Sequence, residues 1–242
     1  MKLDEDESTY SNPKNFLPLP YPYLGEKLPI DRFDIDCDGF FTFMGRKKFK
    51  QVLEQISELR RRGYMKLFVY GTVGYGKSHI LSAIACFLFR TGKRVVFLPD
   101  CRQLAVDPVK YIKFALLLTY ENDDAKIREI NACEDFCQII NFCESLYEEK
   151  LYFIVDQMNA LDELDNTGVS SEKKQQTREN LDKMVDNHFY IKSSSADYKT
   201  MLHLMAKQTN ELKIKLFGGF DEVRLRNLLY IVNVLYIYVI FI

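Results

Sequence analysis

Residues 71–78 of this 242-residue chain read Gly71-Thr72-Val73-Gly74-Tyr75-Gly76-Lys77-Ser78 and match the pattern Gly-x-x-x-x-Gly-Lys-Ser/Thr. Glycines let the backbone curl so that successive N–H groups point at phosphate oxygens, and the start of a following helix adds partial positive charge. We expect Lys77 to lie exposed and to reach the β- and γ-phosphates, while the Ser78 hydroxyl ligates Mg²⁺. The segment therefore predicts a phosphate-binding loop with contacts from Gly71, Val73, Gly74, Tyr75, Gly76, Lys77, Ser78 and His79.

Apolar segments on both sides of the loop support this interpretation. Residues 65–70 form a short apolar run typical of a buried strand, and residues 80–89 are apolar enough for a buried helix. A strand, a glycine-rich loop and a helix, in this order, are the structural context that the motif needs.

A carboxylate follows a later apolar run at residues 151–155. This carboxylate is Asp156, and a strand that ends there beside the loop would make it the second protein ligand of Mg²⁺, with Ser78 as the first. Buried strands often end in Asp, so the run is informative mainly because the loop lies upstream of it. We predict Ser78 and Asp156 as the metal site.

The residue after Asp156 is Gln157. An amide can orient an attacking water molecule, but it cannot accept the proton as a carboxylate does. Asp162, Glu163 and Asp165 are near enough in sequence to take that role, although an acidic loop is usually just solvated. The sequence therefore predicts nucleotide binding more firmly than hydrolysis, with Lys77, Asp156, Gln157 and Ser194 as the candidate catalytic residues.

Two further segments have open interpretations. Ser193–Ser195 follows a fourth apolar run and would either hydrogen-bond the γ-phosphate or the attacking water, or form an ordinary loop. Phe43–Arg46 would either contact an adenine or form a turn before a helix. The basic clusters at 46–48 and 60–62 are expected to be solvated helix ends, with a nuclear import signal as the alternative.

Strand and helix patterns alternate along the chain, which favours a parallel sheet covered on both faces. We predict an α/β, three-layer P-loop NTPase fold with a central, mostly parallel five-stranded sheet. Expected strands are 65–70, 95–98, 151–155, 189–191 and 213–217; expected helices are 49–59, 80–89, 108–118, 134–149, 172–187 and 198–208. Asp107 is expected to cap the third of these helices, with Pro108 at its first position.

The ends of the chain differ from its middle. Five of the seven prolines fall within residues 13–29 after an acidic run, which predicts an extended or disordered arm over residues 1–35. Residues 36–226 are expected to form the NTPase domain. Residues 227–242 carry no charge and are expected to be a core element, a truncation product or, less favoured because Asn233 interrupts the run, a membrane anchor.

Composition is that of a globular protein: 47% of residues are hydrophobic, 28% are charged, and the net charge is −1. This balance gives no global reason to bind nucleic acid or an anionic membrane. The six cysteines contain no Cys-x-x-Cys pair, so they predict neither a structural zinc site nor a disulfide scaffold. Cys133 and Cys137 are expected to share a helix face. No signal peptide is evident, and a cytoplasmic or nuclear location is expected.

Together these features resemble P-loop ATPases of the additional-strand class, which includes AAA+ and STAND modules. The closer resemblance is to the NTPase module of Crinkler-type effectors and retrotransposon-hot-spot proteins, carried by the loop, by Asp156-Gln157-x-Asn159, by Ser193–Ser195 and by a Gly-Gly-Phe at 218–220. This resemblance covers residues 40–225 and implies ATP and Mg²⁺ as cofactors. It also implies a protein or nucleic-acid partner through a further domain, and it is compatible with oligomerisation. No helical lid with a second sensor arginine follows the fifth strand, and no ubiquitin-like header or secretion leader is evident.

The leading hypothesis is a Mg²⁺-ATP-binding NTPase domain that hydrolyses ATP slowly. The alternative is a nucleotide-gated interaction module that binds ATP with little or no hydrolysis. A small-molecule kinase would need an arginine-rich lid, and the residues after Lys110 show none clearly.

Overall fold

A computed structural model describes residues 6–162, 168–195 and 211–216. A sheet of five strands forms its centre, in the order β4-β5-β6-β3-β7, and each neighbouring pair is parallel. The strands are β3 (Lys66–Gly71), β4 (Val95–Leu98), β5 (Tyr152–Val155), β6 (Phe189–Ser195) and β7 (Leu212–Leu216). The predicted α/β class with a parallel five-stranded sheet is thereby confirmed.

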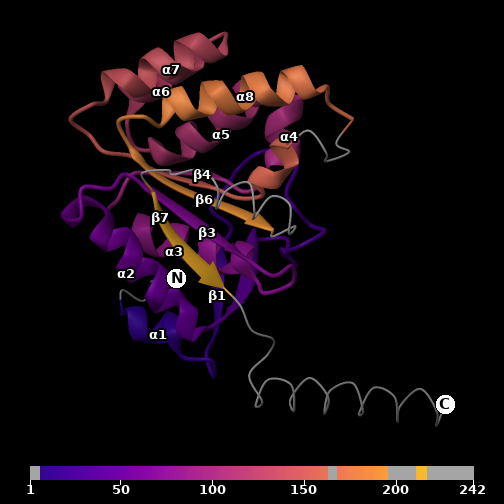
Figure 1. Cartoon of the computed structure of the whole chain (residues 1–242), viewed down its shortest axis with the longest axis vertical. Coiled ribbons are helices and arrows are strands. Elements are labelled where there is room, and N and C mark those ends of the chain that lie inside the picture. The colour runs from indigo at the N-terminus through magenta and orange to yellow at the C-terminus, as the bar shows by residue number, and fades with distance from the viewer. Residues whose placement is uncertain (1–5, 163–167, 196–210, 217–242) are drawn as a thin grey trace, which may run out of the picture.

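Helices cover both faces of this sheet, which gives the predicted three layers (Figure 1). On one side lie α2 (Lys47–Arg61) and α3 (Lys77–Arg90). The other side carries α4 (Cys101–Val106), α5 (Pro108–Thr119), α6 (Asp124–Ala132), α7 (Phe136–Ser145) and α8 (Ser171–Met184). A 3₁₀ turn, η1 (Met158–Leu161), follows β5.

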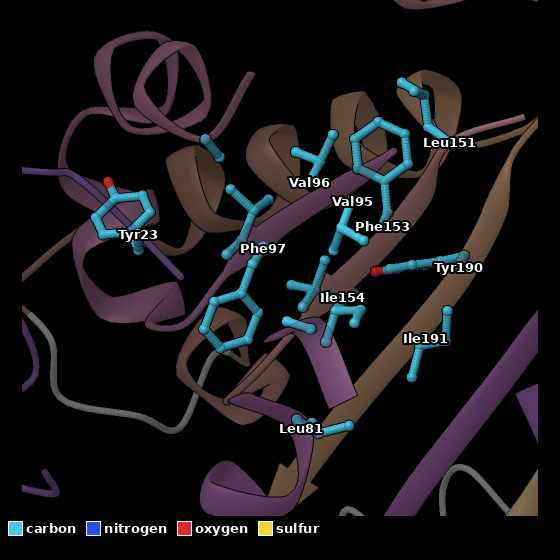
Figure 2. Packing of buried hydrophobic residues seen from close by; sticks show 14 of the residues in the cluster. Tyr23, Leu81, Val95, Val96, Phe97, Leu151, Phe153, Ile154, Tyr190 and Ile191 are labelled. Carbon is cyan, nitrogen blue, oxygen red and sulfur yellow. The ribbon is translucent and has the colours of Figure 1, made fainter. Parts of the chain in front are cut away.

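The core lies between the sheet and these two helical layers. All four residues of β4 are buried, as are the last three of β5, because parallel strands are covered on both faces. Figure 2 shows the apolar side chains of β4, β5 and β6 packed together, among them Val95, Val96, Phe97, Phe153, Ile154, Tyr190 and Ile191. The sheet therefore determines the positions of the polar residues at the carboxyl ends of its strands.

The N-terminal segment differs from the predicted arm. Residues 6–35 contain α1 (Glu7–Ser11) and β1 (Phe16–Pro20), and β1 pairs antiparallel with β2 (Phe40–Met44) in a separate two-stranded sheet. Five side chains of the segment are almost fully buried in the core: Tyr10, Leu19, Tyr21, Tyr23 and Phe33. Burial of these large apolar groups offsets the entropy of ordering the chain, and the prolines are tolerated because β1 is an edge strand.

Two cysteines also lie differently from the prediction. Cys133 caps the C-terminus of α6, whereas Cys137 belongs to α7, so the two do not share a helix face. The break comes from Asp135, whose side chain accepts a hydrogen bond from the backbone N–H of Gln138 and starts a new helix.

Several predicted features fall outside the described residues: the helix at 198–208, the Gly-Gly-Phe at 218–220 and the uncharged tail at 227–242. Within the part of the chain that is described, no helix has both the length and the apolar character needed to cross a bilayer.

Candidate functional site

The glycine-rich loop connects the central strand β3 to the N-terminus of α3. β3 ends at Gly71 and α3 begins at Lys77, so the loop lies at the carboxyl edge of the parallel sheet. At Gly71 a Cβ atom would lie 1.9 Å from the carbonyl oxygen of Leu216, and only glycine therefore lets β7 pair this closely with β3. The predicted strand, loop and helix are all present.

The guanidinium of Arg46 contacts the loop at Tyr75 and Gly76. Gly76 has φ +80°, and a Cβ atom at this position would lie 2.1 Å from Nη1 of Arg46. The same Nη1 donates a hydrogen bond to the carbonyl oxygen of Tyr75. Phe43, in the segment before Arg46, is fully buried in β2. The basic residue predicted as a solvated helix end thus contacts the loop itself.

Lys77 is buried rather than exposed as predicted. Its Nζ donates hydrogen bonds to the carbonyl oxygens of Gly71, at 3.0 Å, and Thr72, at 2.8 Å. The ammonium therefore finds its hydrogen-bond partners in the loop's own backbone. Burial lowers the pKa of Lys77, while the nearby carboxylate of Asp156 opposes that shift.

Ser78 and Asp156, the two predicted metal ligands, both contact a third residue, Arg32. Nη1 of Arg32 lies 3.3 Å from Oγ of Ser78 and 3.0 Å from Oδ2 of Asp156. Nη2 of the same guanidinium donates to the carbonyl oxygen of Pro99 at 3.0 Å. One cationic group therefore bridges the start of α3 and the end of β5.

The other carboxylate oxygen of Asp156 has partners of its own. Oδ1 accepts hydrogen bonds from the Ser193 hydroxyl and from the backbone N–H of Gln157, the latter at 2.9 Å. These bonds hold Oδ1, while Oδ2 faces the Arg32 guanidinium. Ser194, the predicted site residue, is buried in β6 and is paired in register with Tyr70 of β3. The serines continue the strand rather than forming a loop.

Gln157 has a left-handed backbone conformation, φ 61° and ψ 43°. Such a conformation is strained for a residue with a side chain, and strain of this kind gathers at functional sites. With its amide oxygen turned toward Arg32, Gln157 accepts hydrogen bonds from Nε at 3.2 Å and Nη1 at 3.1 Å. The side chain is thus held at the same cluster as Ser78 and Asp156.

His79 stacks on the Phe33 ring, with centroids 4.4 Å apart and planes 23° from parallel. Burial lowers the pKa of His79 to about 4, and the positive charges of Arg46 and Arg32 add to this effect. The imidazole is therefore neutral at physiological pH. It stacks on Phe33 in the first turn of α3, next to the loop.

The donor set at this edge fits Mg²⁺. A hydroxyl and a carboxylate are hard oxygen ligands, and both already lie within reach of a single cationic nitrogen. In nucleotide sites Mg²⁺ needs only one or two protein ligands, because phosphates and water complete its octahedron. Among the described residues, no group of three or more His, Cys, Asp or Glu that could hold a metal ion is found.

Of the three acidic residues considered as alternatives to Gln157, only Asp162 is among the described residues. Asp162 forms an ion pair with Arg178 of α8. Glu163 and Asp165 lie outside the described residues.

Sequence reasoning missed Arg32, Arg46 as a loop contact, and Ser193 as the partner of Asp156. A single arginine in a proline-rich segment carries no pattern, and its role depends on tertiary contacts 46 and 124 positions away along the chain. The run of three serines was singled out in the sequence with Ser194 as the candidate residue. In the structure, the hydroxyl that bonds Asp156 is that of Ser193.

A known protein family matches the part of the chain that carries this site. The family described as "Bacterial DnaA ATPAse domain" matches residues 36–196, a range that contains the loop, Asp156 and the serines. No curated protein matches. A solved structure titled "Crystal structure of DNA replication initiation factor" is similar, with 17% identity and a TM-score of 0.41, over 80% of this chain and 50% of that chain. "Structure of C. elegans PCH-2" is similar with 10% identity and a TM-score of 0.40, over 78% of this chain and 46% of that one. The chain thus spans about half the length of these two structures.

Proposed function

The chain belongs to the bacterial DnaA ATPase-domain family, and on that premise we propose that it binds ATP with Mg²⁺ at the loop of residues 71–78 and hydrolyses it slowly. A nucleotide-binding ATPase module follows from the family. The choice of ATP, the metal and the slow rate form the proposal. It is supported above all by the convergence of Ser78 Oγ and Asp156 Oδ2 on one cation beside the loop.

Each residue has a proposed part in this function. Backbone N–H groups of the loop and the ammonium of Lys77 hold the phosphates, and Lys77 exchanges its bonds to Gly71 and Thr72 for bonds to phosphate oxygens. Ser78 and Asp156 hold Mg²⁺, which neutralises charge on the phosphates when bound. Gln157 orients the attacking water, and Ser194 donates a hydrogen bond near the γ-phosphate.

Lys77→Ala tests the phosphate-binding role. We expect ATP binding measured by calorimetry to fall by at least about 100-fold, because a charged hydrogen bond to phosphate contributes about 1.5–3 kcal/mol and more when it is partly desolvated. Lys93→Ala, at an exposed lysine beyond the end of α3, is the matched control and should bind normally. Equal affinity of the Lys77 variant and wild type would refute the loop assignment.

A nucleotide-gated interaction module remains the second candidate, and Gln157 is the observation that favours it. The residue that follows Asp156 is an amide, which cannot accept a proton, so turnover should be well below the ~10 s⁻¹ typical of enzymes.

Gln157→Glu separates the two candidates. The new carboxylate would place a base directly after Asp156, and we expect phosphate release to rise. If wild type hydrolyses ATP briskly and the variant loses activity, then Gln157 is itself the effective catalytic group. If neither protein releases phosphate while both bind ATP tightly, the gated module is correct.

The closer kinship with Crinkler-type NTPase modules stays a prediction that rests on Asp156-Gln157-x-Asn159 and the triple serine. Oligomerisation and a protein or nucleic-acid partner are likewise proposals, since the chain spans about half of its structural neighbours. Analytical ultracentrifugation with and without ATP tests the first of these.

A further inference from the structure

Arg32 comes from the N-terminal segment but reaches the centre of the candidate metal site. A turn holds its backbone, since the N–H groups of Arg32 and Phe33 both donate to the carbonyl oxygen of Pro29. The next side chain, Phe33, is buried against Phe41 and His79. Arg32 is therefore anchored on its C-terminal side while its guanidinium extends toward β5.

The guanidinium lies among oxygen atoms. Beyond Ser78 Oγ, Asp156 Oδ2 and the Pro99 carbonyl oxygen, Nη2 lies 3.4 Å from Oδ2 of Asp100. Only 16% of the Arg32 side chain is exposed, and 4% of each carboxylate. Hydroxyl and carboxylate oxygens that face a common point are also the ligands that a Mg²⁺ ion takes from a protein.

Each of the two carboxylates near the Arg32 guanidinium has an arginine partner. Arg102 binds Asp100 through Nε and Nη2 and also reaches Asp31 at 2.8 Å, so Asp100 has an arginine of its own. For Asp156 the ion pair found in the described part of the chain is with Arg32, at 3.0 Å. A buried carboxylate needs a positive partner, which either Arg32 or a metal ion can supply, but the two cannot occupy the same place.

We propose that Arg32 competes with Mg²⁺ for Ser78 and Asp156 and thereby sets the Mg²⁺ concentration at which the metal–nucleotide complex forms. This inference rests on the proposed function. In the absence of metal, Arg32 neutralises Asp156 and reduces its repulsion of the triphosphate. When Mg²⁺ takes the two oxygens, the guanidinium leaves them and the turn at residues 29–33 loosens.

Arg32→Met tests the competition, because it keeps the aliphatic stem and removes the charge. Binding of a non-hydrolysable ATP analogue is measured by calorimetry in EDTA and across a Mg²⁺ series. We expect weaker binding in EDTA and a Mg²⁺ midpoint that is lower by about tenfold, the change that accompanies about 1.4 kcal/mol. Arg102→Met is the matched control, an arginine of the same cluster with no hydrogen bond to Ser78 or Asp156 among those described; its midpoint should match wild type.

Hydrogen exchange on the wild-type chain gives a second readout that needs no variant. Amides of residues 30–35 should exchange faster with Mg²⁺ and the analogue than with the analogue in EDTA. An unchanged midpoint in Arg32→Met, an equal shift in Arg102→Met, or unchanged exchange despite tighter binding would each overturn the competition while leaving nucleotide binding intact. Failure of wild type to bind the analogue at all would remove the proposed function and this inference together.

Discussion

At the scale of single residues, the carboxylate of Asp156 is the point where the site is organised. Its Oδ1 is fixed by Ser193 and by the N–H of Gln157, which leaves Oδ2 to face a cation. Asp156 could be predicted because a carboxylate after a buried strand is a local pattern. Ser193 could be predicted only as one of three neighbouring serines, since the strand's alternation decides which hydroxyl points toward β5.

His79 provides a pH-dependent test at the same scale. Its pKa is about 4 in the folded chain and 6.5 in ordinary surroundings, so on acidification the unfolded chain takes up the proton first. The stability that this residue contributes is fully present above about pH 6.5 and is lost as the pH falls toward 4, by about 3 kcal/mol at most.

The measurement is the free energy of unfolding in urea at pH 7 and pH 5, for wild type and His79→Phe. We expect the variant's free energy of unfolding to be higher relative to wild type at pH 5 than at pH 7. Phenylalanine keeps the stack on Phe33 and takes up no proton. A difference that is the same at both pH values would mean that His79 titrates normally.

At the scale of elements, the buried strands and long helices were predictable, because continuous apolar runs and helical spacing are properties of short segments. β3, β4, β5 and α3 lie within one or two residues of the predicted bounds at most ends. The short elements α1 and β1 were not predictable. Each has a single buried residue, Tyr10 or Leu19, which is too few to make a pattern. Pro18 and Pro20 also argue against a strand unless that strand is at an edge.

Asp107 tests a predicted local signal directly. Its side chain accepts a hydrogen bond from the N–H of Lys110 at 3.2 Å, and Pro108 occupies the first turn of α5. Asp107→Ala should lower the free energy of unfolding by about 1 kcal/mol, whereas Asp107→Asn keeps an acceptor and should lose only a few tenths. Equal losses in thermal or urea unfolding would show that the cap contributes little.

At the scale of the whole molecule, the N-terminal segment is part of the folded domain and of its site. It supplies Arg32 to the candidate metal site and Phe33 to the aromatic stack with His79, next to the loop. The family match begins at residue 36 and so leaves these residues out. Arg32 belongs to no local pattern, because its contacts lie 46 and 124 positions away along the chain, and the sequence therefore indicated the loop but not its N-terminal partner.

Truncation tests this dependence. A chain that begins at residue 36 loses five buried side chains: Tyr10, Leu19, Tyr21, Tyr23 and Phe33. Loss of a buried aromatic group costs about 3–5 kcal/mol, and the sum exceeds the 5–15 kcal/mol stability of most domains. We expect no cooperative thermal transition by circular dichroism. A chain that begins at residue 6 keeps all five and should melt as the full chain does; a cooperative melt of the shorter chain would make the segment dispensable.

The strand order β4-β5-β6-β3-β7 also affects the order in which the strands can pair during synthesis. Lys66 of β3 pairs with Tyr190 on one edge, and Leu67 pairs with Leu212 on the other. Both partners leave the ribosome long after β3 does, so β3 has two open edges throughout most of synthesis. Closing such long loops is entropically unfavourable and slow. β4 and β5 can pair before either edge of β3 is covered, and the loop at the end of β3 therefore acquires its final geometry among the last steps of folding.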